Sequence, residues 1–120
     1  MINFPALGDR RSQGIIAKEK MPKLYEYLGI VIFFYANEHE PIHIHARKGE
    51  YESKAEIILM NGKVEEIVIS NVGGKDPLKG NELKNLKTFL KFYADAIVQK
   101  WIDYFVYHRD VNFERITKKL

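Results

Sequence analysis

The stretch GIVIFFYANEHEPIHIHARKGEYESKAEIILMNGKVEEIVIS, residues 29–70, decides the fold of this chain. Runs rich in Ile, Val, Phe and Tyr recur along it, several with apolar and polar residues in alternation, and turn residues separate them. This pattern is typical of β-strands. The dipeptide Asn61-Gly62 lies between two such runs and predicts a tight hairpin turn, because both residue types tolerate positive φ angles. We therefore predict an antiparallel meander sheet of about four strands.

A long amphipathic helix is expected after the sheet, from about Asn81 to Tyr107. Its apolar residues recur at three- and four-residue steps: Leu83, Leu86, Leu90, Tyr93, Ala94, Ile97, Trp101 and Tyr104. This spacing places one apolar stripe along the helix, and such a stripe needs a surface to cover. The predicted fold is therefore α+β, with one long C-terminal helix packed on one face of the sheet.

The two ends of the chain have different patterns. Residues 1–20 contain Gly, Pro and charged clusters without a sustained period, and the dense apolar pattern begins at Met21. We predict an N-terminal extension or arm over residues 1–20 and a single α+β domain over residues 21–120. The tail from Val111 onward alternates apolar and polar residues, so it either adds an edge strand or wraps the end of the helix.

Composition excludes several classes of function. The 120 residues include no cysteine, so disulfides and thiolate catalysis are excluded, and a metal ion would need His, Asp or Glu ligands. The longest apolar run, Ile30–Ala36, is too short to span a membrane, and a secretory signal is missing from the N-terminus, so we expect a cytoplasmic protein. The net charge of +3 is compatible with an anionic partner such as nucleic acid, but solubility alone also accounts for it.

Three histidines lie within seven positions of the segment NEHEPIHIHARKGEYES, residues 37–53. They are His39, His43 and His45. Because side chains alternate along a strand, Ile44 and Ala46 are expected to face the core. Arg47 then shares the opposite face with the last two histidines, and the first one can fold towards them from the turn held by Pro41.

One chemistry that suits this cluster is metal binding. The imidazoles of His39, His43 and His45, with a carboxylate from Glu38 or Glu40, are ligands for a divalent transition metal such as zinc, copper or nickel. No distant fourth ligand and no HExxH helix motif is present in the sequence. The sequence does not require a cofactor, so the metal is one alternative among three.

A second chemistry is acid–base catalysis on a phosphodiester. His43 and His45 would exchange protons, because imidazole titrates near neutral pH, and Arg47 would contact the phosphate. The expected binding residues around this pair are His39, Lys48, Glu50 and Tyr51.

The third interpretation is a surface without catalysis. In this interpretation the polar residues on the outer face of the strand are solvent-exposed or face a partner protein, and the imidazoles are hydrogen bonded across strands. An exposed strand edge would then give affinity for that partner, and the imidazoles would make binding depend on pH.

The segment Met21–Ile57 resembles the opening of a family of small bacterial proteins known as a domain of unknown function. Its members begin with Met-Pro, continue through a Gly-Ile strand, and carry a His-x-Pro-x-His-x-His-Ala segment followed by Gly-Glu-Tyr. The likeness extends over about residues 21–108. The motif corresponds here to His39, Pro41, His43, His45, Ala46, Gly49, Glu50 and Tyr51. Ile44 departs from the pattern, because an aromatic residue is common at that position, and so do the twenty residues before Met21.

The resemblance implies a protein partner and does not indicate a particular reaction. Genes of the family often lie beside a second small domain, in an arrangement that looks like a toxin–antitoxin pair. We therefore expect one component of such a module, which binds a small cognate protein and is compatible with RNA binding through the histidine-rich strand. The resemblance brings no catalytic mechanism with it, and the sequence leaves the oligomeric state open.

Overall fold

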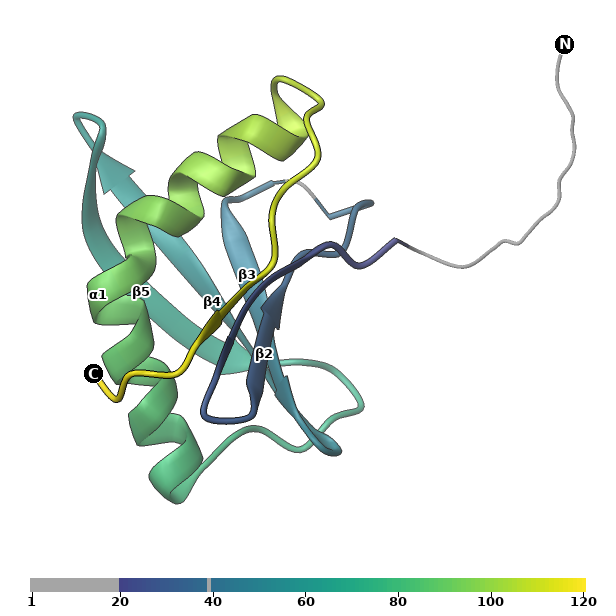
Figure 1. The fold of residues 1–120 in the computed structure, drawn as a ribbon, viewed down its shortest axis with the longest axis vertical. Coiled ribbons are helices and arrows are strands. Elements are labelled where there is room, and N and C mark those ends of the chain that lie inside the picture. The colour runs from purple at the N-terminus through teal and green to yellow at the C-terminus, as the bar shows by residue number, and fades with distance from the viewer. Residues whose placement is uncertain (1–19, 39) are drawn as a thin grey trace, which may run out of the picture.

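A computed structural model describes residues 20–38 and 40–120, and Figure 1 shows its fold. In chain order these residues form β1 (Lys23–Tyr27), β2 (Ile30–Phe33), β3 (His43–Lys48), β4 (Tyr51–Met60), β5 (Lys63–Asn71), α1 (Gly80–Phe105) and β6 (Glu114–Ile116). The predicted α+β class with one long C-terminal helix is confirmed. The predicted arm lies, except for Lys20, outside the described residues and stays a prediction.

The sheet has six strands in the order β5-β4-β3-β2-β1-β6, so the prediction of about four strands was too low. The four expected strands are β2 to β5, which are antiparallel neighbours. Strand β1 was missed because it turns into β2 through Leu28 and Gly29, both with positive φ, and leucine is no turn signal. The expected edge strand in the tail is β6, which pairs with β1 in parallel.

The β4–β5 hairpin turns at Asn61 and Gly62, whose φ angles are 55° and 78°, as predicted. Its register contains a bulge: Leu59 pairs with Val64, but the preceding Ile58 pairs with Glu66. Glu65 is thus the additional residue on β5. An additional residue of this kind interrupts the alternation of side chains, which is why no regular tight-turn register accounts for the two consecutive glutamates.

Helix α1 covers one face of the sheet and forms the core with it (Figure 1). Its buried residues are Leu86, Phe89, Leu90, Ala94, Ile97 and Trp101. Strand β3 contributes Ile44 and Ala46 to this core, both fully buried. Burial of a large apolar side chain stabilises a fold by roughly 1.5–3 kcal/mol. Within the described part of the chain, no helix has the length and apolar character that a membrane crossing requires.

The opposite face of the sheet carries the histidines of β3. The connection between β2 and β3 folds over this face, where Tyr35 and Glu38 contact His45. The sheet is therefore covered by the helix on one face and, around β3, by a short connection on the other.

Candidate metal centre

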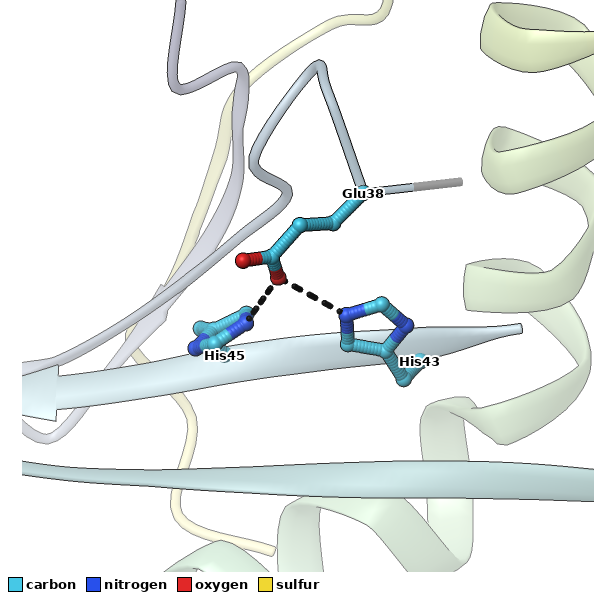
Figure 2. Close-up of side chains that lie close together, drawn as sticks. All are labelled: Glu38, His43 and His45. Atoms are coloured by element: carbon cyan, nitrogen blue, oxygen red, sulfur yellow. Dashed lines mark hydrogen bonds and ion pairs between the residues drawn. The ribbon is translucent and has the colours of Figure 1, made fainter. Parts of the chain in front are cut away.

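Two histidines of β3 and one glutamate of the β2–β3 connection converge on one point. Oε1 of Glu38 lies 3.2 Å from Nε2 of His43 and 3.0 Å from Nε2 of His45. Figure 2 shows the carboxylate of Glu38 reaching down to both rings, which stand side by side on the strand. One ligand atom from each of the three residues lies within 4.8 Å of the others. The connection and the strand thus bring together three groups of the kind that bind transition metals.

The alternation of β3 was predicted correctly, but the exposure of its outer face was not. Ile44 faces the helix and both histidines lie on the other face, as expected. Yet His45 is only 3% exposed. The ring of Phe33 stacks on His45 at 5.6 Å, and the ring of Tyr35 approaches it edge-on at 4.5 Å. The alternation of residues in β3 does not predict the burial of His45, because Phe33 comes from the neighbouring strand and Tyr35 from the β2–β3 connection.

Each histidine has its Nδ1 atom held by an acceptor. Nδ1 of His43 lies 2.7 Å from the carbonyl oxygen of Pro41, and a carbonyl oxygen only accepts hydrogen bonds. Nδ1 of His45 lies 3.0 Å from Oε2 of Glu52. Each Nδ1 therefore carries the proton and donates it. In the neutral ring the lone pair is then on Nε2, which in both residues points towards Glu38.

Glu52 on β4 belongs to this site, although the sequence suggests Glu50 and Glu52 only as weak acid–base candidates and only Glu50 was expected at the site. Its side chain is 1% exposed, and its Oε2 also accepts a hydrogen bond of 3.2 Å from the hydroxyl of Tyr35. Its other oxygen, Oε1, has no hydrogen-bond partner among the described residues. The pairing of β3 with β4 places Glu52 at the site. Glu52 lies directly opposite Arg47, so its side chain is on the same face of the sheet as the histidines.

The surroundings shift the pKa values of two groups here. Partial burial by itself raises the pKa of Glu38. When both rings are imidazolium, the hydrogen bonds donated by their Nε2–H groups and their positive charge outweigh this effect, so the pKa is lowered in the metal-free site. Burial raises the pKa of Tyr35, and the charge of Glu52 raises it further. Glu38 is therefore held as a carboxylate, the form that binds a metal ion, and Tyr35 is held as a neutral donor to Glu52.

A pocket of about 440 Å³ opens beside the cluster. Glu38 and His43 form one of its walls, and Lys54 and Glu56 of β4 form another. Glu40, the other carboxylate that the sequence suggested as a metal ligand, lines this pocket but is not a member of the convergent group. The convergent group is thus accessible from a cavity of small-molecule size.

The other residues expected at the site are dispersed. Arg47 lies on the histidine face, but its guanidinium covers the ring of Phe33 at 5.0 Å. Lys48 lies on the helix face of β3 by the same alternation that places Ile44 there, and its Nζ is 2.9 Å from Oε2 of Glu82 at the start of the helix. Glu50 and Tyr51 lie at the β3–β4 turn and are exposed. The structure thus does not bring Lys48 and Tyr51 together with the histidines, and His39 lies outside the described residues.

Comparison with known proteins adds a family and no function. No curated protein and no solved structure matches the chain. One family model, described as a domain of unknown function (DUF4160), matches residues 29–102. The match runs from the turn before β2 into the last turns of α1, and it includes every residue of the convergent group. Because it spans more than half of the chain, the chain belongs to the DUF4160 family.

Proposed function

We propose that this protein binds one divalent transition metal ion through Glu38, His43 and His45. The observation that carries the proposal is the convergence of the two Nε2 atoms on one carboxylate oxygen, with both Nδ1 atoms held by acceptors. Histidines that bind metals generally donate the second ring nitrogen to a carboxylate or a backbone carbonyl. His45 with Glu52 and His43 with Pro41 follow these two arrangements.

Electrostatics explains why such a group needs a cation. Two neutral Nε2 atoms and a carboxylate oxygen are all acceptors, so they repel one another unless a positive charge lies among them. That charge is either a metal ion or protons that convert the rings to imidazolium. Ligands of a tetrahedral zinc ion at 2.0–2.1 Å are about 3.3 Å apart. The separations of 3.0 and 3.2 Å between the carboxylate oxygen and the two Nε2 atoms are close to this value. All three ligand atoms lie within 4.8 Å of one another, so the two imidazoles would move closer together around an ion.

Two imidazoles and one carboxylate are typical of zinc, copper, nickel or iron rather than magnesium or calcium. Three protein ligands leave a coordination position for water or substrate, as in catalytic zinc sites. A metal ion there supplies Lewis-acid chemistry and a bound water of lowered pKa. The adjoining pocket provides space for a substrate. A metal-dependent hydrolase fits these features, and direct acid–base catalysis by His45 fits less well because both of its ring nitrogens are engaged.

Equilibrium dialysis tests this proposal. The full chain is purified without an affinity tag, treated with a chelator and dialysed against zinc, and we expect one bound ion per chain. His43→Ala and Glu38→Gln should each abolish binding at micromolar zinc. His108→Ala is the matched control, because His108 is an exposed histidine after α1 and should have no effect. A folded wild-type chain that binds no zinc, or a His43→Ala variant that binds it normally, contradicts the proposal.

A second candidate function is the partner-binding role in a toxin–antitoxin-like module. The observation that favours it is the outer edge of β5, nine residues long, which pairs with no other strand in the described residues. Such an edge can add a strand from another protein. In this role His43 and His45 would act on RNA, with Arg47 as the phosphate contact.

Expression in bacteria tests the second candidate. Growth arrest with cleaved RNA, lost in a folded His43→Ala/His45→Ala variant, supports a nuclease toxin. Normal growth with intact RNA, in cells that express the wild-type chain and in cells that express the variant, contradicts the toxin role. Copurification with the neighbouring gene product then tests partner binding alone.

A further inference from the structure

The pocket beside the proposed metal site is also lined by a lysine outside the metal-binding group. Lys54 of β4 is exposed, lines this pocket with Glu38 and His43, and makes no ion pair with any other described residue. We infer that the pocket binds a small ligand by one anionic oxygen group, a phosphate or a carboxylate, held between the metal ion and the Lys54 ammonium. This inference rests on the proposed metal site.

The register of the sheet places Lys54 beside the metal ligands. Lys54 is the direct cross-strand partner of His45 on β3 and of Ser70 on β5. Directly opposite residues on antiparallel strands have Cβ atoms roughly 4.5–5.5 Å apart and point to the same face. A metal ligand, an ammonium and a hydroxyl thus follow one another across three strands.

The cations expected from the sequence do not take this position. Arg47 covers the ring of Phe33 and lines a different depression, together with Glu50 and Lys75. Lys48 pairs with Glu82. Lys54 is therefore the cation that shares a cavity with His43, and it replaces Arg47 as the candidate contact for an anion.

Charge in the pocket limits the ligand to one anionic group. A divalent ion with the Glu38 carboxylate and two neutral imidazoles carries a net charge of +1. The buried Glu52 carboxylate behind His45 offsets this charge, and Lys54 adds a positive charge at the pocket itself. Glu56, the cross-strand partner of His43, and Glu40 also line the pocket. These carboxylates repel a second anionic group, and they accept hydrogen bonds from hydroxyls or amines. The volume of about 440 Å³ suits a ligand of small-molecule size.

Visible absorption of the cobalt-loaded full chain tests the inference. Inorganic phosphate is titrated in one arm and acetate in the other, because an anion that enters the coordination shell of cobalt changes its spectrum. We expect saturable binding in at least one arm, and the arm with the tighter binding identifies the anion class. Lys54→Met should weaken it by about tenfold or more, since a charged hydrogen bond is lost. Glu56→Gln should strengthen it, because a repulsive charge is removed.

Two controls separate this inference from the metal proposal. Lys63→Met removes an exposed lysine at the β4–β5 turn and should not change anion binding. Cobalt affinity, measured in each variant before the anion is added, should stay at the wild-type value. Normal cobalt binding without anion binding, or equal effects of Lys54→Met and Lys63→Met, overturns the inference and leaves the metal site intact. A wild-type chain that fails to bind cobalt overturns both.

Discussion

The two faces of β3 are both buried, but by different chemistry. On one face Ile44 and Ala46 pack against α1 and are fully buried. On the other face His45 is almost as buried, beneath Tyr35 and between two carboxylates. At Ile44 and Ala46 the first face is buried by apolar contacts, and only its partly exposed end, Lys48, makes an ion pair with the helix. The second depends on hydrogen bonds whose removal leaves buried polar groups without partners.

The difference teaches that burial alone does not identify the core of this protein. Apolar burial against α1 stabilises the fold, whereas the buried polar groups around His45 fix the direction of its ring nitrogens. Changes on the helix side should therefore alter stability, and changes on the histidine side should alter metal affinity. The following predictions test this division, from the largest expected effect to the smallest.

The largest effect is expected from Phe89→Ala on the helix side. Phe89 is fully buried, and its ring contacts Tyr25, Tyr27 and Tyr93 at centroid distances of 4.5–5.4 Å. Loss of a buried phenylalanine side chain lowers the free energy of unfolding by roughly 3–5 kcal/mol. Urea denaturation measures it. Phe92→Ala is the control, because Phe92 on the same helix is 62% exposed and should change stability by less than about 0.5 kcal/mol.

The next effect is a loss of stability at alkaline pH from Tyr25, also on the helix side. Burial, with the nearby charge of Glu114, raises the pKa of Tyr25 to about 12. The unfolded chain has the ordinary value near 10 and loses the proton first, so this contribution is complete below pH 10 and is lost as the pH rises to about 12. It amounts to roughly 2–3 kcal/mol.

Unfolding of the wild type and a Tyr25→Phe variant at pH 9 and at pH 12 measures this contribution. The wild type should lose more stability between the two values than the variant does. Equal losses would show that Tyr25 does not hold its proton in the fold.

On the histidine side, Glu52→Gln should lower zinc affinity by about 10–100-fold, because His45 loses the charged acceptor that orients its ring. Glu50→Gln is the matched control: Glu50 is exposed at the β3–β4 turn, two residues away, and should leave zinc affinity unchanged. Isothermal titration with zinc measures both. Equal affinities in the two variants would mean that Glu52 has only a structural role.

The smallest effect is expected from Tyr35→Phe. This variant removes the hydrogen bond of 3.2 Å to Oε2 of Glu52 and keeps the ring over His45. The free energy of unfolding should fall by about 1 kcal/mol. Zinc affinity should fall less than in Glu52→Gln, because the contact of Glu52 with His45 remains. A larger loss of affinity in Tyr35→Phe would place Tyr35, not Glu52, in control of the site.

Much of this difference between the two faces of β3 can be predicted from the sequence. The alternation around Ile44 assigns the two faces of β3, and the helical spacing of Leu86, Leu90 and Ile97 predicts what covers the first face. Glu38 was considered as a ligand because it lies close in sequence to the histidines. These signals are local, and local patterns specify strands and helices well.

The remaining parts depend on contacts between distant segments. Glu52 and Lys54 join the histidines only through the β3–β4 register. Lys48 lies on the helix face by the alternation of β3, but its partner there, Glu82, belongs to a distant segment. Among the described residues, strand β6 pairs only with β1, which lies almost ninety residues earlier in the chain. Because each of these depends on where another segment lies, composition and spacing alone do not determine them.

The most direct test of the central claim is X-ray absorption at the zinc edge of the full chain, purified without a tag and loaded with one equivalent of zinc. The account predicts two imidazole nitrogens at about 2.0–2.1 Å with oxygen in the remaining positions. It also predicts that the imidazole signal disappears in His43→Ala/His45→Ala. A spectrum without imidazole scattering, or one that the double substitution leaves unchanged, would contradict the proposed site.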